Sequence, residues 1–213
     1  MATRSRRAEI YPDRCVCGCS ASADCDPAFV MLLSYALKPD DRETFSDLQR
    51  RADETALSTP RGPGALAAVA AMDSRRADYY KALSWRHARL PLRDLRPWPG
   101  MSGLPRDWCH GTIEDTAELI RREGMPASAE RRLCSMVALA DQYSRREVVS
   151  WLTRLPLIAV PDAVLHDRPA HTTAAWGLDE GCARSVALSL LGVKTAGVLV
   201  GEFRGVEGER NNL

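Results

Sequence analysis

The sequence lacks a long apolar segment, which excludes whole classes of protein. No run of about 18 apolar residues occurs, so we expect no membrane-spanning helix and no membrane partner. The basic start MATRSRRAEI is not followed by the apolar stretch of a secretory signal. Seven cysteines, an odd number without secretory context, favour free thiols or metal ligands over a disulfide framework. We therefore expect a cytoplasmic protein in a reducing, intracellular compartment.

The chain also has little net charge and very little lysine. Its formal charge is +1, which gives no strong attraction to nucleic acid or anionic lipid as a whole. Lysine occurs only at Lys38, Lys81 and Lys194, and the other basic residues are arginines. Guanidinium groups recognise phosphate and carboxylate well, although a coding bias that also enriches alanine explains the same composition.

Three regions differ in composition. We interpret residues 1–26 as a cysteine-rich tail or small metal module, residues 27–96 as a helical module, and residues 97–213 as an α+β domain. The proline- and glycine-rich linker RPWPGMSGLPRD separates the last two. The expected fold class is α+β, with a helical N-terminal half and a small mixed sheet with helices in the C-terminal half.

Local signals place several elements. Asp26, followed by proline, marks the start of a buried helix, and residues 64–90 continue a long helical pattern. Thr112 caps a helix that ends at Gly124. The segment SAERRLCSMVALADQYSRREVVSWLTRL is helical in period, as one helix or two. Asp179 is expected to cap a helix that closes on a glycine, and PLIAV and AGVLVGEF read as strands.

Four cysteines gather near the start of the chain. Cys15, Cys17, Cys19 and Cys25 lie within eleven residues and have the ligand chemistry for tetrahedral Zn²⁺. The gaps between them are one, one and five residues, whereas zinc knuckles usually separate paired cysteines by about two to four. The cluster therefore indicates zinc or another soft metal, or else free thiols, with a disulfide as a third alternative.

The segment His110-Gly111-Thr112 has the composition of a ligand-binding loop. Glycine lets a ligand approach the backbone, and the first N–H groups of a helix are donors for an anion or a carboxamide. An imidazole can hydrogen-bond a ribose hydroxyl. The alternative is structural, with Thr112 as an N-cap, Gly111 as a turn residue and His110 as a loop side chain.

Two segments are similar to conserved blocks of a known family. WCHGTIEDTAELIRREGM resembles the first block of the ADP-ribosyltransferase superfamily, which includes the poly(ADP-ribose) polymerases and the RNA 2′-phosphotransferases. In that family a strand leads into His-Gly-Thr, then a helix and a glycine. WGLDEGCARSVALSLLGVKTAGVLVGEFRG resembles a later block, in which a strand carries a glutamate before a glycine. The resemblance covers residues 107–126 and 174–206.

The resemblance implies NAD as the cofactor, a nucleotide-like ligand, and transfer of ADP-ribose to a protein or nucleic-acid acceptor such as RNA. His110 would contact the ribose that carries the nicotinamide. Gly111 would leave room for the nicotinamide amide, and Thr112 would steady the loop.

Two positions depart from the family pattern. Trp176, or no residue, stands where the family has a tyrosine that stacks on nicotinamide. Glu202 lies on the matched strand, whereas the catalytic glutamate of the family lies on a strand beyond it. Either Glu202 stabilises the oxocarbenium-like ribose from another position, or the catalytic strand is absent and the protein is degenerate or truncated. An isolated glutamate on a strand is otherwise a solvated surface residue.

A cysteine nucleophile is the rival enzymatic hypothesis. Cys109 or Cys182 with His171 as the base would form the minimal pair for acyl transfer. Cys182 is expected to open a helix, whose dipole would lower the pKa of its thiol. The chain order of Cys109 and His171 resembles that of papain-like leader proteases of RNA viruses, although their glycine-cysteine-aromatic signature is absent. Buried structural cysteine is the alternative for each thiol.

A third hypothesis is a non-catalytic interaction or RNA-binding protein. The helical residues 27–90 would dock a partner, and pairs of arginines would contact RNA. No interleaving of aromatic and basic residues supports specific reading of nucleic acid. These pairs include Arg50-Arg51, Arg75-Arg76, Arg121-Arg122 and Arg131-Arg132.

Overall fold

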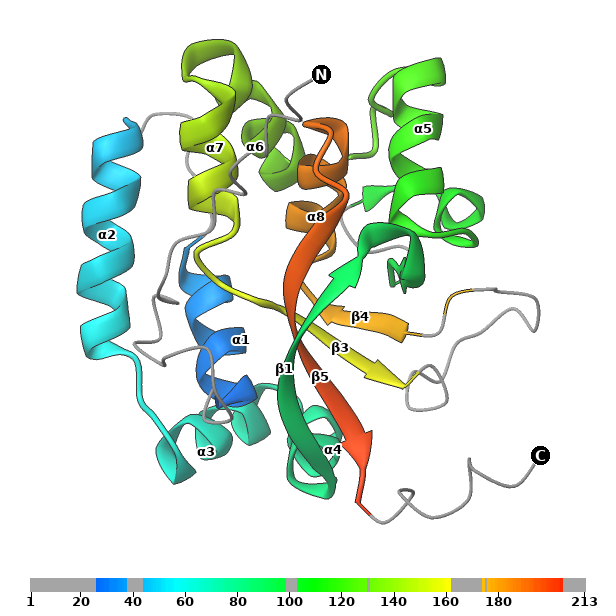
Figure 1. Ribbon diagram of the computed structural model, residues 1–213. Helices are drawn as coiled ribbons and strands as arrows, with labels where there is room; N and C mark the ends of the chain where they lie inside the picture. Colours follow the sequence, from blue (N-terminus) through cyan, green and yellow to red (C-terminus); the bar gives the residue numbers. More distant parts are fainter. Residues whose placement is uncertain are drawn as a thin grey trace, which may run out of the picture.

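The computed structural model describes residues 26–37, 44–98, 103–129, 131–161, 174 and 176–204. Within these residues, eight α-helices and one five-stranded mixed sheet confirm the α+β fold class (Figure 1). The longest helix in this part of the chain has 14 residues, and none has the length and apolar character of a membrane span. Several predicted site residues lie outside the described ranges, namely Cys15, Cys17, Cys19, Cys25 and His171.

Helices make up most of the first half. They are α1 (Pro27–Ala36), α2 (Phe45–Ser58), α3 (Pro63–Met72) and α4 (Ser74–Ala82). The predicted start of α1 is confirmed, because the Asp26 carboxylate accepts a hydrogen bond of 3.0 Å from the Ala28 N–H and proline occupies the first turn. The long helical pattern predicted from residue 64 forms two short helices, α3 and α4, as far as Ala82.

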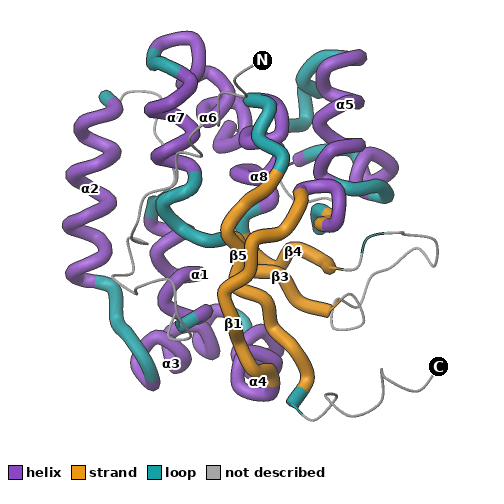
Figure 2. Tube along the Cα trace, viewed as in Figure 1, coloured by secondary structure: helices purple, strands orange, loops and turns teal. Residues whose placement is uncertain are grey.

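The sheet draws strands from both halves of the chain. It consists of β1 (Leu83–Pro91), β2 (Leu95–Arg96), β3 (Leu157–Pro161), β4 (Trp176–Glu180) and β5 (Thr195–Phe203). The spatial order is β1-β5-β3-β4-β2. β3 runs parallel to β5 and β2 parallel to β4, whereas β1 pairs with β5 and β3 with β4 in antiparallel fashion. The strands are coloured orange in Figure 2. The predicted strands PLIAV and AGVLVGEF correspond to β3 and β5.

The expectation of helix up to Leu90 is wrong for the segment that forms β1. All nine residues of Leu83–Pro91 pair with β5, from Leu83 opposite Phe203 to Pro91 opposite Thr195. Tryptophan and histidine in this segment have weak helix propensity, and a partner strand of the same length supplies a complete ladder. Tertiary pairing therefore overrides the local helical period.

The second half contains the remaining helices. They are α5 (Ile113–Glu123), α6 (Arg131–Gln142), α7 (Arg145–Leu152) and α8 (Cys182–Leu190). The segment left open as one helix or two forms α6 and α7, because Ser144 begins α7 with a capping box. The expectation that Asp179 caps α8 is wrong. Asp179 lies within β4, and Gly181 is the N-cap residue with a φ of +98°.

Helices cover both faces of the sheet. Ile158 of β3 and Leu199 of β5 pack in a core cluster with α1 to α4, whereas their neighbours Ala159 and Val200 pack in a second cluster with α5 to α8. Successive residues of a strand point to opposite faces of the sheet. Because helices cover both faces, the central strands β3 and β5 carry apolar residues on both sides. The sheet thus connects the helices of the first half to those of the second.

Candidate functional site

The His110-Gly111-Thr112 segment joins a short 3₁₀ helix, η3 (Arg106–Cys109), to α5. A strand precedes this segment in the family block, and η3 takes its place here. The predicted cap at Thr112 is confirmed, and it forms a complete capping box with Asp115. The Thr112 N–H and hydroxyl each donate to Asp115 Oδ2 at 2.8 Å, and the Thr112 hydroxyl accepts from the Asp115 N–H at 3.2 Å. The capping box therefore uses the N–H groups of Thr112 and Asp115 at the start of α5.

Gly111 is required by the same capping box. A Cβ at this position would lie 2.7 Å from Asp115 Oδ2 and 2.8 Å from Asp115 Cβ. Thr112 is buried, and its polar groups are used within the cap. His110, in contrast, is exposed to solvent. The histidine is thus the side chain of this segment that is open to a ligand.

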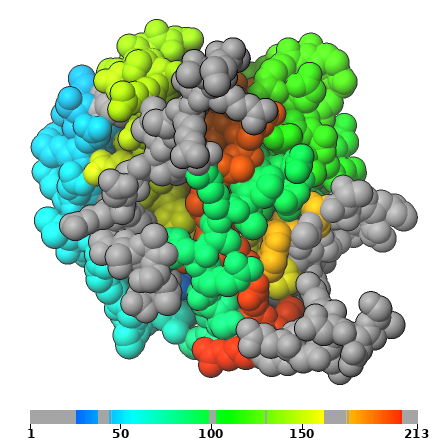
Figure 3. Space-filling model, viewed as in Figure 1, coloured from blue at the N-terminus to red at the C-terminus, as the bar shows by residue number. Residues whose placement is uncertain are grey.

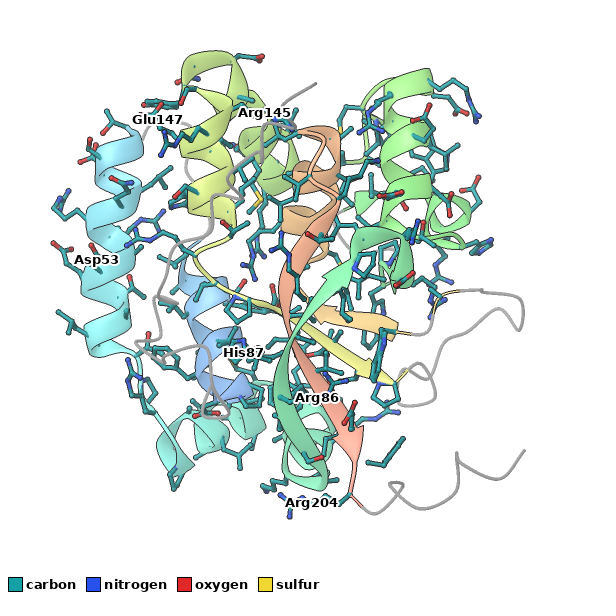
Figure 4. All side chains as sticks on the ribbon, viewed as in Figure 1. Asp53, Arg86, His87, Arg145, Glu147 and Arg204 are labelled. Atoms are coloured by element: carbon teal, nitrogen blue, oxygen red, sulfur yellow. The ribbon has the colours of Figure 1, made fainter. Side chains whose placement is uncertain are left out.

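Glu202 lies in a solvated ion pair at the far end of β5. Its carboxylate accepts from Arg86 Nη2 at 2.7 Å and from Arg86 Nε at 2.9 Å, and its side chain is 42% exposed. Figure 4 shows Arg86 on β1. This arrangement matches the surface alternative for Glu202.

No contact among the described residues joins His110 to Glu202. The first turn of α5 lies at the opposite end of β5, where Glu114 Oε1 is 3.4 Å from Lys194 Nζ, one residue before the strand begins. A strand of nine residues spans about 30 Å at about 3.3 Å per residue. The two predicted catalytic residues therefore lie toward opposite ends of one strand.

Trp176 is the first residue of β4. It pairs with Leu95 of β2 and Pro161 of β3 and is half-buried. Its ring packs against the same core cluster as Trp108, which lies two residues before His110. Trp176 is thus on the same side of the sheet as the His110 segment.

The two thiols of the protease hypothesis are buried. Cys109 is fully buried, and Cys182 is 3% exposed. Burial raises the pKa of the Cys182 thiol to about 12, so the expectation that the helix dipole lowers this pKa is wrong. The Trp98 N–H lies 3.4 Å from Cys182 Sγ. A protonated, enclosed thiol is a poor nucleophile.

Metal ligands do not gather in the described part of the chain. No group of three or more histidine, cysteine, aspartate or glutamate side chains there could hold a metal ion. The zinc hypothesis concerns the N-terminal cysteines, which lie outside the described residues, and it stays a prediction.

Asp179, near the end of β4, is a buried carboxylate whose partners the sequence did not predict. Asp179 Oδ1 accepts from Arg76 Nε at 3.1 Å and from the Tyr79 hydroxyl, and its Oδ2 accepts from the Tyr80 hydroxyl at 2.5 Å. Burial raises the pKa of the Asp179 carboxyl, and Arg76 and both hydroxyls oppose that rise. Burial and the Asp179 charge raise the pKa of Tyr79 and Tyr80. All four groups satisfy one another, so the cluster is a structural anchor.

The next residue, Glu180, is a second buried carboxylate. It accepts from the Ser34 hydroxyl at 2.9 Å and from the Gly181 N–H at 3.0 Å, and Arg132 Nη2 lies 3.6 Å away. The residue that follows must be glycine, because a Cβ at position 181 would lie 2.5 Å from Leu157 Cδ2. In sequence, an Asp-Glu pair before a glycine resembles a loop, and no local pattern distinguishes it from a buried strand end.

Comparisons with known proteins gave no assignment. No protein-family model matches the chain, and searches of curated proteins and of solved structures found no significant match.

Proposed function

We propose that this protein binds a nucleotide-like small molecule, with NAD or ADP-ribose as the candidate ligand, at the segment before α5. The observation that carries the proposal is the exposure of His110, which follows the buried Cys109 and stands two residues before the buried Thr112. The backbone on both sides of His110 is thus anchored in the protein, while the imidazole itself faces solvent. A ring nitrogen in this position can hydrogen-bond a ribose hydroxyl.

The packing of the two segments that resemble the family supports this proposal. Ile113 and Ile120 of α5 belong to the same core cluster as Ala183 and Val186 of α8. The first segment therefore lies directly against the second, as parts of one ligand-binding unit would.

Binding without transfer is the form of the proposal that fits Glu202. Its carboxylate is paired with Arg86 and lies toward the other end of β5 from the start of α5. A carboxylate that stabilises an oxocarbenium-like ribose must lie beside that ribose. Transfer of ADP-ribose to a protein or RNA acceptor stays a prediction, and so does the role of Trp176 as a stacking partner.

Calorimetric titration with NAD and with ADP-ribose tests the binding. The His110→Ala variant is expected to lose binding, because it removes the exposed hydrogen-bonding group and leaves the capping box intact. His87→Gln on β1 is the matched control and is expected to bind as the wild type does. Absence of binding by the wild type, or equal affinity of the His110→Ala variant, would contradict the proposal.

Incubation with labelled NAD tests transfer separately. We expect ligand binding without incorporation of label into protein or RNA. Incorporation that is lost in both His110→Ala and Glu202→Gln would establish the transferase instead.

A further inference from the structure

One end of the β1–β5 ladder gathers aromatic side chains that are open to solvent. Leu83 stands opposite Phe203 at this end, and Phe203 is 48% exposed. Trp85 stands opposite Gly201, so its side chain points to the same face of the two strands as that of Phe203. The Trp85 ring packs over the glycine, because a Cβ at Gly201 would lie 2.9 Å from Trp85 Cη2. Figure 3 shows the end of β5, in red, at the surface of the molecule next to β1, in green.

Two further aromatic rings adjoin this face. Leu83 forms a small buried cluster with one residue of β3. Tyr79 of α4, Trp85 and Trp98, the last of which follows β2, are half-buried and pack against this cluster. We call these three side chains together with Phe203 the aromatic face. Rings from separate segments of the chain thus lie around one small cluster.

The polar atoms of two of these rings are already bonded within the protein. The Trp85 indole N–H donates to the Tyr80 carbonyl at 3.0 Å, and the Tyr80 ring meets the Trp85 ring edge-on with centroids 5.3 Å apart. The Tyr79 hydroxyl donates to the buried carboxylate of Asp179. Because Trp85 and Tyr79 are fixed in the folded protein, they lose little side-chain entropy when a partner binds. Their ring carbons are the part that is left to contact that partner.

Exposed cations border the aromatic face. Arg75 lies one helical turn before the first tyrosine of α4, on the same side of the helix. Lys81 lies two residues before β1 begins and Arg204 directly follows β5, so both extend from the same end of the antiparallel ladder (Figure 4). All three side chains are exposed, and none forms an ion pair with another described residue. The exposed carboxylates of α4 and its cap are Asp78 and Asp73, so cations outnumber carboxylates here.

Rings beside unpaired cations indicate the class of partner. Every base can stack on an aromatic ring, and every phosphate attracts a cation. We propose that the aromatic face binds single-stranded nucleic acid without sequence preference, with bases stacked on Phe203 and Trp85 and phosphates against Lys81 and Arg204. The His110 segment lies toward the opposite end of β5, so this proposal does not depend on the first. Phe203 and Arg204 come from the far end of the chain, and the order of the sequence therefore does not show this grouping.

Fluorescence anisotropy of a labelled oligouridylate of about ten nucleotides, titrated with the full chain, tests this surface. We expect saturable binding that weakens as the salt concentration rises. A duplex of the same length is expected to bind at least about fivefold more weakly, because its bases are already stacked on one another. Phe203→Leu removes the ring and keeps an apolar side chain, so it is expected to weaken binding by about fivefold or more. Phe203→Trp restores a ring and is expected to bind at least as well as the wild type.

Charge variants test the phosphate contacts while every ring stays in place. Lys81→Gln and Arg204→Gln are each expected to weaken binding and to lower the slope of log affinity against log salt by about one. Arg93→Gln is the matched control and is expected to bind as the wild type does, because the Arg93 side chain is 74% exposed and lies beyond the opposite end of β1. An equal loss in this control would contradict the placement of the site.

Three other results would overturn the proposal. The first is a wild type without saturable binding, and the second is a Phe203→Leu variant that binds as tightly as the wild type. The third is an oligoglutamate peptide that displaces the labelled strand as well as unlabelled oligouridylate does, because charge alone would then suffice and the surface would suit an acidic protein. His110→Ala is expected to leave oligonucleotide binding unchanged. A loss in that variant would place the oligonucleotide at the His110 segment instead.

Discussion

Arg76 of α4 and Asp179 of β4 are 103 residues apart in the chain and form a buried ion pair of 3.1 Å. Arg76 also donates to the backbone carbonyl of Asp179 at 3.2 Å. The pair thus connects the helices of the first half to the strand that precedes α8. Because both groups are buried, each depends on the other for its charge compensation.

Removal of one partner is therefore expected to be costly. We predict that Asp179→Asn lowers the free energy of unfolding by about 3–5 kcal/mol, because it leaves the Arg76 guanidinium buried without a counter-charge. Urea unfolding monitored by circular dichroism measures this loss. Glu202→Gln, which breaks an ion pair exposed to solvent, is expected to cost less than about 1 kcal/mol.

A double-mutant cycle separates the pair from its surroundings. Arg76→Met combined with Asp179→Asn is expected to be less destabilising than the sum of the two single changes. Strict additivity would mean that the two groups do not interact and would contradict the assignment.

Stability is predicted to fall at alkaline pH. Burial raises the pKa of the Cys182 thiol from 9.0 to about 12, so the unfolded chain loses this proton first. The contribution is fully present below pH 9 and is lost as the pH rises from there towards 12. Each such group changes the free energy by up to about 1.4 kcal/mol per pH unit. Tyr79 and Tyr80, whose pKa values are also raised by burial, act in the same direction.

Chemical unfolding at pH 8, 9 and 10 measures this dependence. The Cys182→Ala variant has no thiol to titrate, and its stability is expected to fall less steeply between pH 9 and 10. An identical slope in the variant and the wild type would show that the folded thiol titrates normally.

Gly111→Ala is predicted to disrupt the start of α5. The added Cβ would meet the Asp115 carboxylate at 2.7 Å and displace it from the capping box. Loss of a cap costs about 1 kcal/mol, within a range of about 0.5–2 kcal/mol. Gly197→Ala on β5, where no atom lies within 4 Å of the new methyl group, is the matched control and is expected to be neutral or stabilising. Equal losses in both variants would contradict the geometric argument.

Alkylation of the native protein is predicted to distinguish the described thiols. Cys134 is half-buried, whereas Cys109 and Cys182 are buried. Treatment with iodoacetamide at pH 8, followed by peptide mass spectrometry, is expected to label Cys134 faster than the other two. Rapid labelling of Cys182 would revive the thiol-nucleophile hypothesis.

Much of the fold could be predicted from local chemistry. Asp26 and Thr112 carry N-cap side chains at helix starts, and β3 and β5 are short apolar segments bounded by turn residues, so their positions follow from sequence. β1 could not be predicted, because its stability depends on a partner strand more than a hundred residues later in the chain. The helical pattern that precedes β1 belongs to α4. No local signal in the sequence marks the change from helix to strand at Leu83.

The site was harder to predict than the fold. The sequence indicates the His-Gly-Thr segment. It does not show why the middle residue is glycine, because the reason is the position of the Asp115 side chain in the folded protein. Asp179 and Glu180 resemble surface residues in sequence. Their partners, Arg76 and Arg132, come from helices elsewhere in the chain, and only tertiary structure brings them together.

A nucleotide-like ligand is proposed to bind beside His110. The most direct measurement is a titration of ¹⁵N-labelled protein with ADP-ribose, followed by amide chemical shifts. We expect saturable shifts centred on the amides from Cys109 to Ile113, and their loss in His110→Ala. Saturable shifts confined to residues away from this segment, or no saturable shifts at all, would contradict the proposal.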